Sequence, residues 1–112
     1  MNQLIAQTEL LLVQVTGDRI RCILQIGSPH READGSWQCP VSLIGWHGDL
    51  VSSGGVDSFH SLCLAIQLVR SLLLKFIASG GKILDSKDHK EFSIEAYFSG
   101  AKSDRPSGRE RG

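Results

Sequence analysis

The sequence predicts an α+β fold, in which one long amphipathic helix packs across an antiparallel sheet of about three to five strands. Two features lead to this expectation. Segments in the first half of the chain alternate apolar and polar residues, which is the period of a strand with one buried face. Between the glycine pairs at residues 54–55 and 80–81, about twenty residues without Gly or Pro follow the period of an amphipathic helix.

Length and charge restrict the possible classes of protein. The chain has 112 residues, which corresponds to one domain. We place this domain in residues 1–98 and expect residues 99–112, which are small, charged and contain Pro and Gly, to be disordered. The 12 basic and 12 acidic residues cancel, and no basic face is visible, so nucleic-acid binding is not expected.

The cysteines indicate a reducing compartment. Cys22, Cys39 and Cys63 all lie in apolar surroundings, and we expect them to be buried, unreactive thiols. An odd number of cysteines and the lack of an apolar N-terminal run are typical of a cytoplasmic protein.

The N-terminal part reads as a β-hairpin. Residues 3–15 are rich in aliphatic side chains, and residues 16–18 carry a turn signal around Gly17. Residues 19–26 then alternate strictly between apolar and polar side chains, as a half-buried strand does.

A loop and further strands follow the hairpin. Residues 27–36 are polar and are expected to form a mobile loop. Residues 37–46 read as a third strand, in which Pro40 lacks an amide hydrogen and therefore belongs at an edge or a bulge. Residues 47–49 form a turn, and residues 50–52 are a candidate short fourth strand.

The helix has recognisable ends. Asp57 or Ser58 can cap its N-terminus, and Gly80 or Gly81 can end it in a left-handed conformation. The expected buried face comprises Phe59, Leu62, Ala65, Ile66, Val69, Leu72, Leu73, Phe76 and Ile77, and the expected polar face comprises His60, Ser61, Gln67, Ser71 and Lys75.

Three leucines do not fit a simple solvated face. Leu64, Leu68 and Leu74 lie within or beside the polar stripe. They are either covered by a loop or the C-terminal segment, or singly exposed, or part of a surface for a partner or a second copy. Because Gln67 and Arg70 interrupt the apolar run, no membrane span is expected.

The segment after the helix is less distinct. Residues 82–84 are a candidate short strand and residues 85–91 a charged loop. Residues 92–98 alternate well and are predicted to form a strand, with a short helix as the alternative.

No signature of catalysis, of a cofactor or of a metal site is found, so no enzyme is predicted. Gly54 and Gly55 precede a helix N-terminus, which can hold an anion, but a flexible entry to the helix is the stronger interpretation. His60 and Cys63 would make only half of a zinc site. Cys39 or Cys63 would need a neighbouring base to act as a nucleophile.

One pattern resembles a known group of proteins. The strand W-x-C-P, with Trp37, Cys39 and Pro40, is followed by G-V-D-S-x-x-x-L-x-L-A-I at residues 55–66. It resembles a family of small bacterial domains of uncharacterised function, over residues 5–80. The resemblance implies a bacterial cytosolic origin and the α+β order above, and it brings no reaction. In general type, the chain is also similar to immunity proteins that neutralise secreted bacterial toxins.

The leading hypothesis is a non-enzymatic protein-binding module of the immunity or antitoxin type, which occludes the active site of a cognate toxin. Aromatic residues dominate the strongest contacts of interfaces, and loop charges steer association. The candidate partner-binding residues are Trp37, Trp46, His47, Asp49, Arg31 and Asp34.

Two alternatives remain. The first is a homo-oligomeric accessory protein with Leu64, Leu68 and Leu74 at a two-fold contact. The second is a small-ligand-binding protein or a small enzyme, whose pocket between helix and sheet would use Cys63, His60 or His47.

Overall fold

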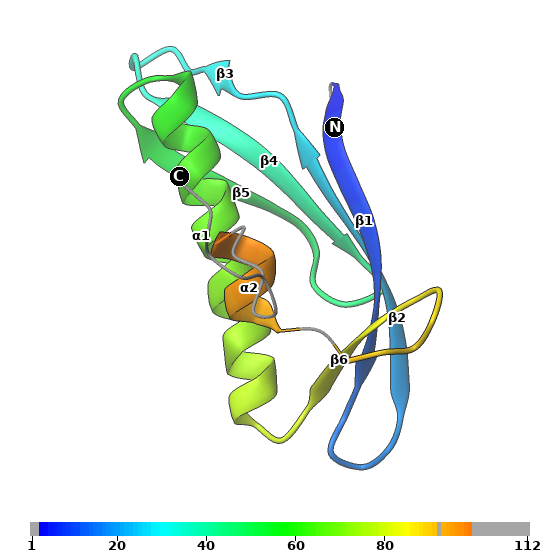
Figure 1. Cartoon of the computed structure of the whole chain (residues 1–112). Coiled ribbons are helices and arrows are strands. Elements are labelled where there is room, and N and C mark those ends of the chain that lie inside the picture. Colours follow the sequence, from blue (N-terminus) through cyan, green and yellow to red (C-terminus); the bar gives the residue numbers. More distant parts are fainter. Residues whose placement is uncertain (1–2, 92, 100–112) are drawn as a thin grey trace, which may run out of the picture.

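An antiparallel sheet and one long helix form the two layers of the molecule (Figure 1). The computed structural model describes residues 3–91 and 93–99. In these residues the elements are β1 (Leu4–Val13), β2 (Arg19–Gly27), β3 (His30–Arg31), β4 (Trp37–Ile44), β5 (Gly48–Gly55), α1 (Ser58–Ala78), β6 (Lys82–Asp85) and α2 (Ile94–Ser99). The predicted α+β class and the antiparallel sheet with one long helix are confirmed.

The sheet is wider than the three to five strands expected. β4 lies between β5 and β2, and β1 lies between β2 and β6, so β5 and β6 are the two edges. In the described residues the sheet has six strands, and a single-residue bridge joins Glu91 to Leu84 as a further pairing segment. The additional pairing comes from β3, which lies within the expected loop at residues 27–36, and from the segment around Glu91.

Pro40 explains why β2 and β3 are separate strands. The pairing of β2 with β4 ends at Ile26 and Val41, and that of β3 begins at His30 and Gln38, along the same edge of β4. Pro40 lies between these two pairings and has no amide hydrogen to donate, so the ladder is interrupted there. Pro40 therefore sits in an inner strand, beside a break in the pairing.

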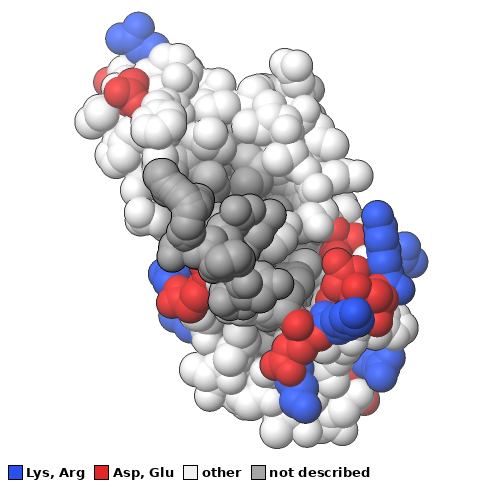
Figure 2. All heavy atoms as spheres, in the orientation of Figure 1, with Lys and Arg blue, Asp and Glu red and all other residues white. Residues whose placement is uncertain are grey.

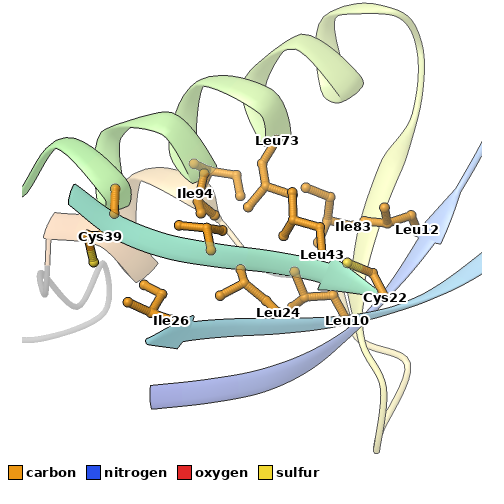
Figure 3. Packing of buried hydrophobic residues seen from close by; sticks show 13 residues of the cluster. Leu10, Leu12, Cys22, Leu24, Ile26, Cys39, Leu43, Leu73, Ile83 and Ile94 are labelled. Atoms are coloured by element: carbon orange, nitrogen blue, oxygen red, sulfur yellow. The ribbon is translucent and has the colours of Figure 1, made fainter. Parts of the chain in front are cut away.

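Alternate residues of the strands face α1 and form one apolar core (Figure 3). The buried members of the core are Leu10, Leu12, Cys22, Leu24, Ile26, Cys39, Val41, Leu43, Ala65, Val69, Leu73, Ile83 and Ile94. The opposite face of the sheet carries Glu9, Arg21 and Gln25 and is not covered by α1. This arrangement is that of an antiparallel sheet with one packed and one solvated face.

The predicted N-cap is confirmed, whereas the predicted buried face of α1 is partly wrong. Asp57 accepts a hydrogen bond from the backbone amide of His60 at 2.7 Å. Phe59, expected in the core, is 74% exposed, and Ser61, expected in solvent, is fully buried. The buried stripe runs instead through residues 61, 65, 69 and 73. By length and hydropathy alone α1 also qualifies as a membrane span, as core helices of soluble proteins can.

The helix is rotated about its axis relative to the predicted orientation because α1 approaches β5 closely. A Cβ atom at Gly55 would lie 2.7 Å from the Cβ of Ser61 and 2.9 Å from its Cα, so nothing larger than Gly fits. The hydroxyl of Ser52 donates to the carbonyl of Ser61 at 3.0 Å, and the hydroxyl of Ser61 donates to the carbonyl of Ser58 at 3.0 Å. The small side chain of Ser61 is thus buried because the helix rests on the strand there.

The C-terminal segment is helical, so the predicted strand over residues 92–98 is wrong. Ile94 and Phe98 are four residues apart, a spacing that places two side chains on one face of either a strand or a helix. In the structure both pack against the core, and Arg70 of α1 pairs with Glu95 at 2.8 Å. Residue 92 and the tail expected to be disordered, from residue 100 on, lie outside the described residues.

We predict that Gly55→Ala destabilises the domain by about 1–3 kcal/mol, the usual range for overpacking. The new methyl group would meet backbone atoms of α1, which cannot move without lifting the helix. Gly81→Ala is the matched control, because the atoms nearest to its methyl group belong to the side chain of Phe76 and not to the backbone. Urea denaturation of both variants measures the difference, and an equal or larger loss for Gly81→Ala would contradict the role given to the contact.

Candidate functional site

Two connections meet at one end of the molecule. Trp37 at the start of β4 pairs with Arg31 of β3 on one side and with Gly55 of β5 on the other. The turn at residues 32–36 and the junction between β5 and α1 therefore lie at the same end (Figure 1). We call Arg31, Asp34, Trp37, Val56 and Phe59 at this end the tip surface.

Two apolar side chains of the tip surface project into solvent. Val56 is 77% exposed and Phe59 is 74% exposed. The backbone that carries them is held on both sides, because the amide of Val56 donates to Nδ1 of His60 at 3.1 Å and the amide of His60 donates to Asp57. Apolar side chains on an ordered, capped backbone are suited to contact another molecule.

Some charged side chains at this end of the molecule already interact with other residues of the domain. The carboxylate of Asp34 accepts hydrogen bonds from the amide and the hydroxyl of Ser36 at 2.9 and 2.7 Å, which lower the pKa of Asp34. Glu32 lies 2.7 Å from Nε2 of His30. Asp34 thus has a structural role in the turn, and steering by the charges of Arg31 and Asp34 stays a prediction.

The other predicted partner-binding residues lie at the opposite end of β4. Trp46 follows the strand and packs edge-on against Phe76 of α1, with ring centroids 5.6 Å apart and an interplanar angle of 78°. It is partly buried against the core, and the ring of His47 lies 4.3 Å from it. The structure therefore separates Trp46, His47 and Asp49 from the tip surface and gives Trp46 a packing role.

The three leucines of the predicted self-association surface differ in where their side chains lie. Leu64, Leu68 and Leu74 are all half-buried. Leu74 packs against the core cluster. Leu64 and Leu68 lie on one flank of α1, one helical turn apart, whereas Leu74 points to a different side.

The uncovered face of the sheet is mixed in character. An ion pair joins Glu9 to Arg21, which lowers the pKa of Glu9 and raises that of Arg21. Such an exposed pair contributes little to stability. Partly exposed aliphatic side chains of β4 and β5, Ile44 and Val51, lie on the same face. On the side of the molecule that carries α1 and α2, shown in Figure 2, charged side chains gather mainly at the end away from the tip surface.

A small cavity opens between the sheet and the two helices. Its volume is about 270 Å³. It is lined by Ala6, Gln7, Thr8, Leu24, Ile26, Ile66, Val69, Tyr97 and Phe98. The residues predicted to serve a pocket between helix and sheet, Cys63, His60 and His47, do not line it. In the described part of the chain no group of three His, Cys, Asp or Glu is placed to hold a metal ion.

Two of the cysteines are fully buried in the core. Cys22 and Cys39 have no exposed surface, and burial raises the pKa of Cys22 to about 11 and that of Cys39 in the same direction. The thiol of Cys39 also donates to the carbonyl of Gly27 at 3.4 Å. Cys63 is half-buried, so the expectation of buried thiols holds for two of the three.

Alkylation with iodoacetamide at neutral pH should modify Cys63 of the native protein well before Cys22 and Cys39, because only an accessible thiolate reacts. Peptide mass spectrometry over time measures the three rates, and the urea-unfolded chain, in which all three react alike, is the control. Early modification of Cys22 would contradict its burial.

The free energy of unfolding should fall as the pH rises from 9 to about 11. The unfolded chain releases the proton of Cys22 near its ordinary pKa of 9.0, whereas the folded chain holds it until about 11, so alkali favours unfolding. Urea titrations at several pH values measure the slope. Cys22→Ala is the control, and an unchanged slope in that variant would assign the effect to other groups.

Comparison with known proteins places the chain in a family. No curated protein and no solved structure matches it. Residues 8–95 match the family described as "Domain of unknown function (DUF6968)". The match runs from β1 through α1 and β6 into α2 and covers most of the chain. The chain therefore belongs to the DUF6968 family of domains of unknown function.

Proposed function

We propose that the chain is a non-enzymatic protein-binding module and that the tip surface is its main contact. The observation that carries this proposal is the exposure of Val56 and Phe59 on a capped backbone, beside Trp37. Single exposed apolar residues are common in proteins. Here an exposed aliphatic and an exposed aromatic side chain lie three residues apart, just after the residue that pairs with Trp37, and together they have the composition of an interface anchor.

The extent of the proposed interface follows from the length of β4. Its eight residues span about 26 Å, so Trp37 and Trp46 lie too far apart to anchor one small contact. A partner centred on the tip surface would reach His47 and Asp49 only by covering the open face of the sheet between them. The tip surface is therefore the proposed centre, and His47 and Asp49 belong at most to its rim.

The partner we propose is a toxin whose active site the domain covers. A projecting apolar pair fits a concave site better than a flat one, and enzyme active sites are concave. Arg31 and Asp34 at the same end of the molecule carry opposite charges, which would orient the partner and not only attract it.

The first test is capture of the partner from native cell extract with the tagged full-length chain, followed by titration calorimetry with the purified partner. Val56→Asp and Phe59→Ala should each weaken binding by roughly thirtyfold, the effect of losing an interface hot spot. If the partner is a toxin, the wild-type domain should also inhibit its activity at equal concentration.

Val15→Asp is the matched control. Val15 is 75% exposed, as Val56 is, but lies in the turn between β1 and β2, at the other end of the molecule. Neither Val56→Asp nor Val15→Asp should change the melting temperature by much, because both side chains are already in water. Equal affinity of all variants would exclude the tip surface, and loss of binding on combined His47→Ala and Asp49→Ala would move the site to the other end of β4.

The cavity favours a small apolar ligand as a second candidate function. Its walls are mainly aliphatic and aromatic, with Gln7 and Thr8 as polar groups at one side. Ile66→Trp should fill the cavity and abolish binding of an apolar fluorescent probe. Ile77→Trp is the control, since Ile77 has similar exposure on the same helix but does not line the cavity. Probe binding unaffected by Ile66→Trp would exclude the cavity as its site.

A further inference from the structure

The two edge strands of the sheet differ in whether a further segment of the chain pairs with them. At β6 the chain closes its own edge, because the amide of Asp85 donates to the carbonyl of Lys90 at 2.8 Å and Leu84 bridges to Glu91. At the other edge, β5 pairs only with β4 among the described residues. The backbone groups of β5 that point away from β4 are thus open to another strand.

Between Gly48 and Ser52 the β5 edge carries neither Lys nor Pro, and the register shift in its pairing with β4 lies beyond Ser52. Edge strands are commonly protected by Lys, Pro or inward-pointing charges. β5 has the sequence GDLVSSGG, in which Asp49 is the only charge. Regular pairing runs from Gly48 to Ser52, and Val51 in this stretch is 47% exposed.

A leucine flank of α1 lies above the same edge. Ser61 rests on Ser52 and Gly55 of β5, whereas Ile66 on the other side of the helix faces the cavity beside β1 and β2. Leu64 and Leu68 follow Ser61 at helical spacing on the side turned to β5. The helix therefore presents half-buried leucines next to the open strand.

We propose that this edge is the contact between two copies of the chain, which pair β5 with β5 in antiparallel orientation about a two-fold axis near Val51. In such a contact the same surface serves both copies, so the surface must be complementary to itself. β5 meets this condition, because Asp49 of one copy lies opposite the uncharged end of β5 in the other. A different partner would need no such self-complementarity.

The surface of α1 beside this edge is also complementary to itself. When α1 of one copy runs antiparallel to α1 of the other about residue 66, Leu64 faces Leu68 of the second copy. Asp57 and Lys75 lie at equal distances on either side of residue 66, so opposite charges meet at both ends of the helix pair. Strand pairing alone buries less than a stable interface needs, and the leucine flank supplies the additional apolar area.

This dimer is independent of the proposed partner binding and leaves the tip surface free. Because the two strands run in opposite directions, the two tip surfaces would lie at opposite ends of the dimer. A dimer would then present two contact sites to a partner or an array of partners.

The test is sedimentation velocity of the full-length chain from low micromolar to near-millimolar concentration. The wild type should shift from the 12.2 kDa monomer to a species of twice that mass. Val51→Lys should raise the dissociation constant roughly tenfold or more, because like charges would meet across the axis. Ile44→Lys is the control and should leave it unchanged: Ile44 is 44% exposed on the same face but sits one strand inside the edge.

A crosslink tests the geometry without depending on a destabilising change. In a Cys63→Ser background, Val51→Cys should form a disulfide-linked dimer under mild oxidation, since residues opposed across the axis lie within bonding reach. Ile44→Cys should not. A wild type that stays monomeric at every concentration would overturn the proposal. A dimer that Val51→Cys fails to crosslink, or that both lysine variants weaken equally, would overturn the edge contact.

Discussion

The contact between Gly55 of β5 and Ser61 of α1 is the constraint on which the rest of the structure depends. No side chain separates the helix from the strand at this point, so it sets both the height and the rotation of α1 above the sheet. The rotation brings Ser61 into the core and leaves Phe59 in solvent. The opposite flank of the helix stands away from β1 and β2, and α2 occupies that space with Ile94 and Phe98. The tip surface, the leucine flank and the cavity are all consequences of one close approach.

The position of the helix could be predicted from its sequence, whereas its orientation could not. Asp57 and the two glycine pairs mark its ends through local chemistry, and those ends are correct to within a residue. Hydropathy then assigns Phe59 to the core and Ser61 to water, because it weighs side chains and ignores backbone distance. Two small residues that fit together, Gly55 and Ser61, reverse this assignment. The signal that could have shown it is the small size of both residues next to the helix start.

The candidate site shows the same division between local and long-range information. Trp37 and Trp46 were reasonable interface candidates by residue type, but which of them packs against the core depends on Phe76, thirty positions further along the chain. Val56 was missed because a single valine in a Gly-rich junction carries no pattern. The strand β3 was missed because two residues are too few to show alternation, and only Pro40 opposite them indicates where the pairing must break.

The separate position of β6 has a consequence for folding. β1, β2 and β4 each pair with the next long strand along the chain, so these contacts close short loops and cost little chain entropy. β6 instead pairs with β1 from the far end of the chain, where Val13 meets Lys82, and only after α1 has crossed the sheet. We expect the meander to form first and β6 with α2 to dock last. Amide hydrogens of β6 should then exchange through a local opening, earlier than those shared by β1 and β2. Loss of that docking alone would expose Ile83 and Ile94 while the remaining sheet stayed intact.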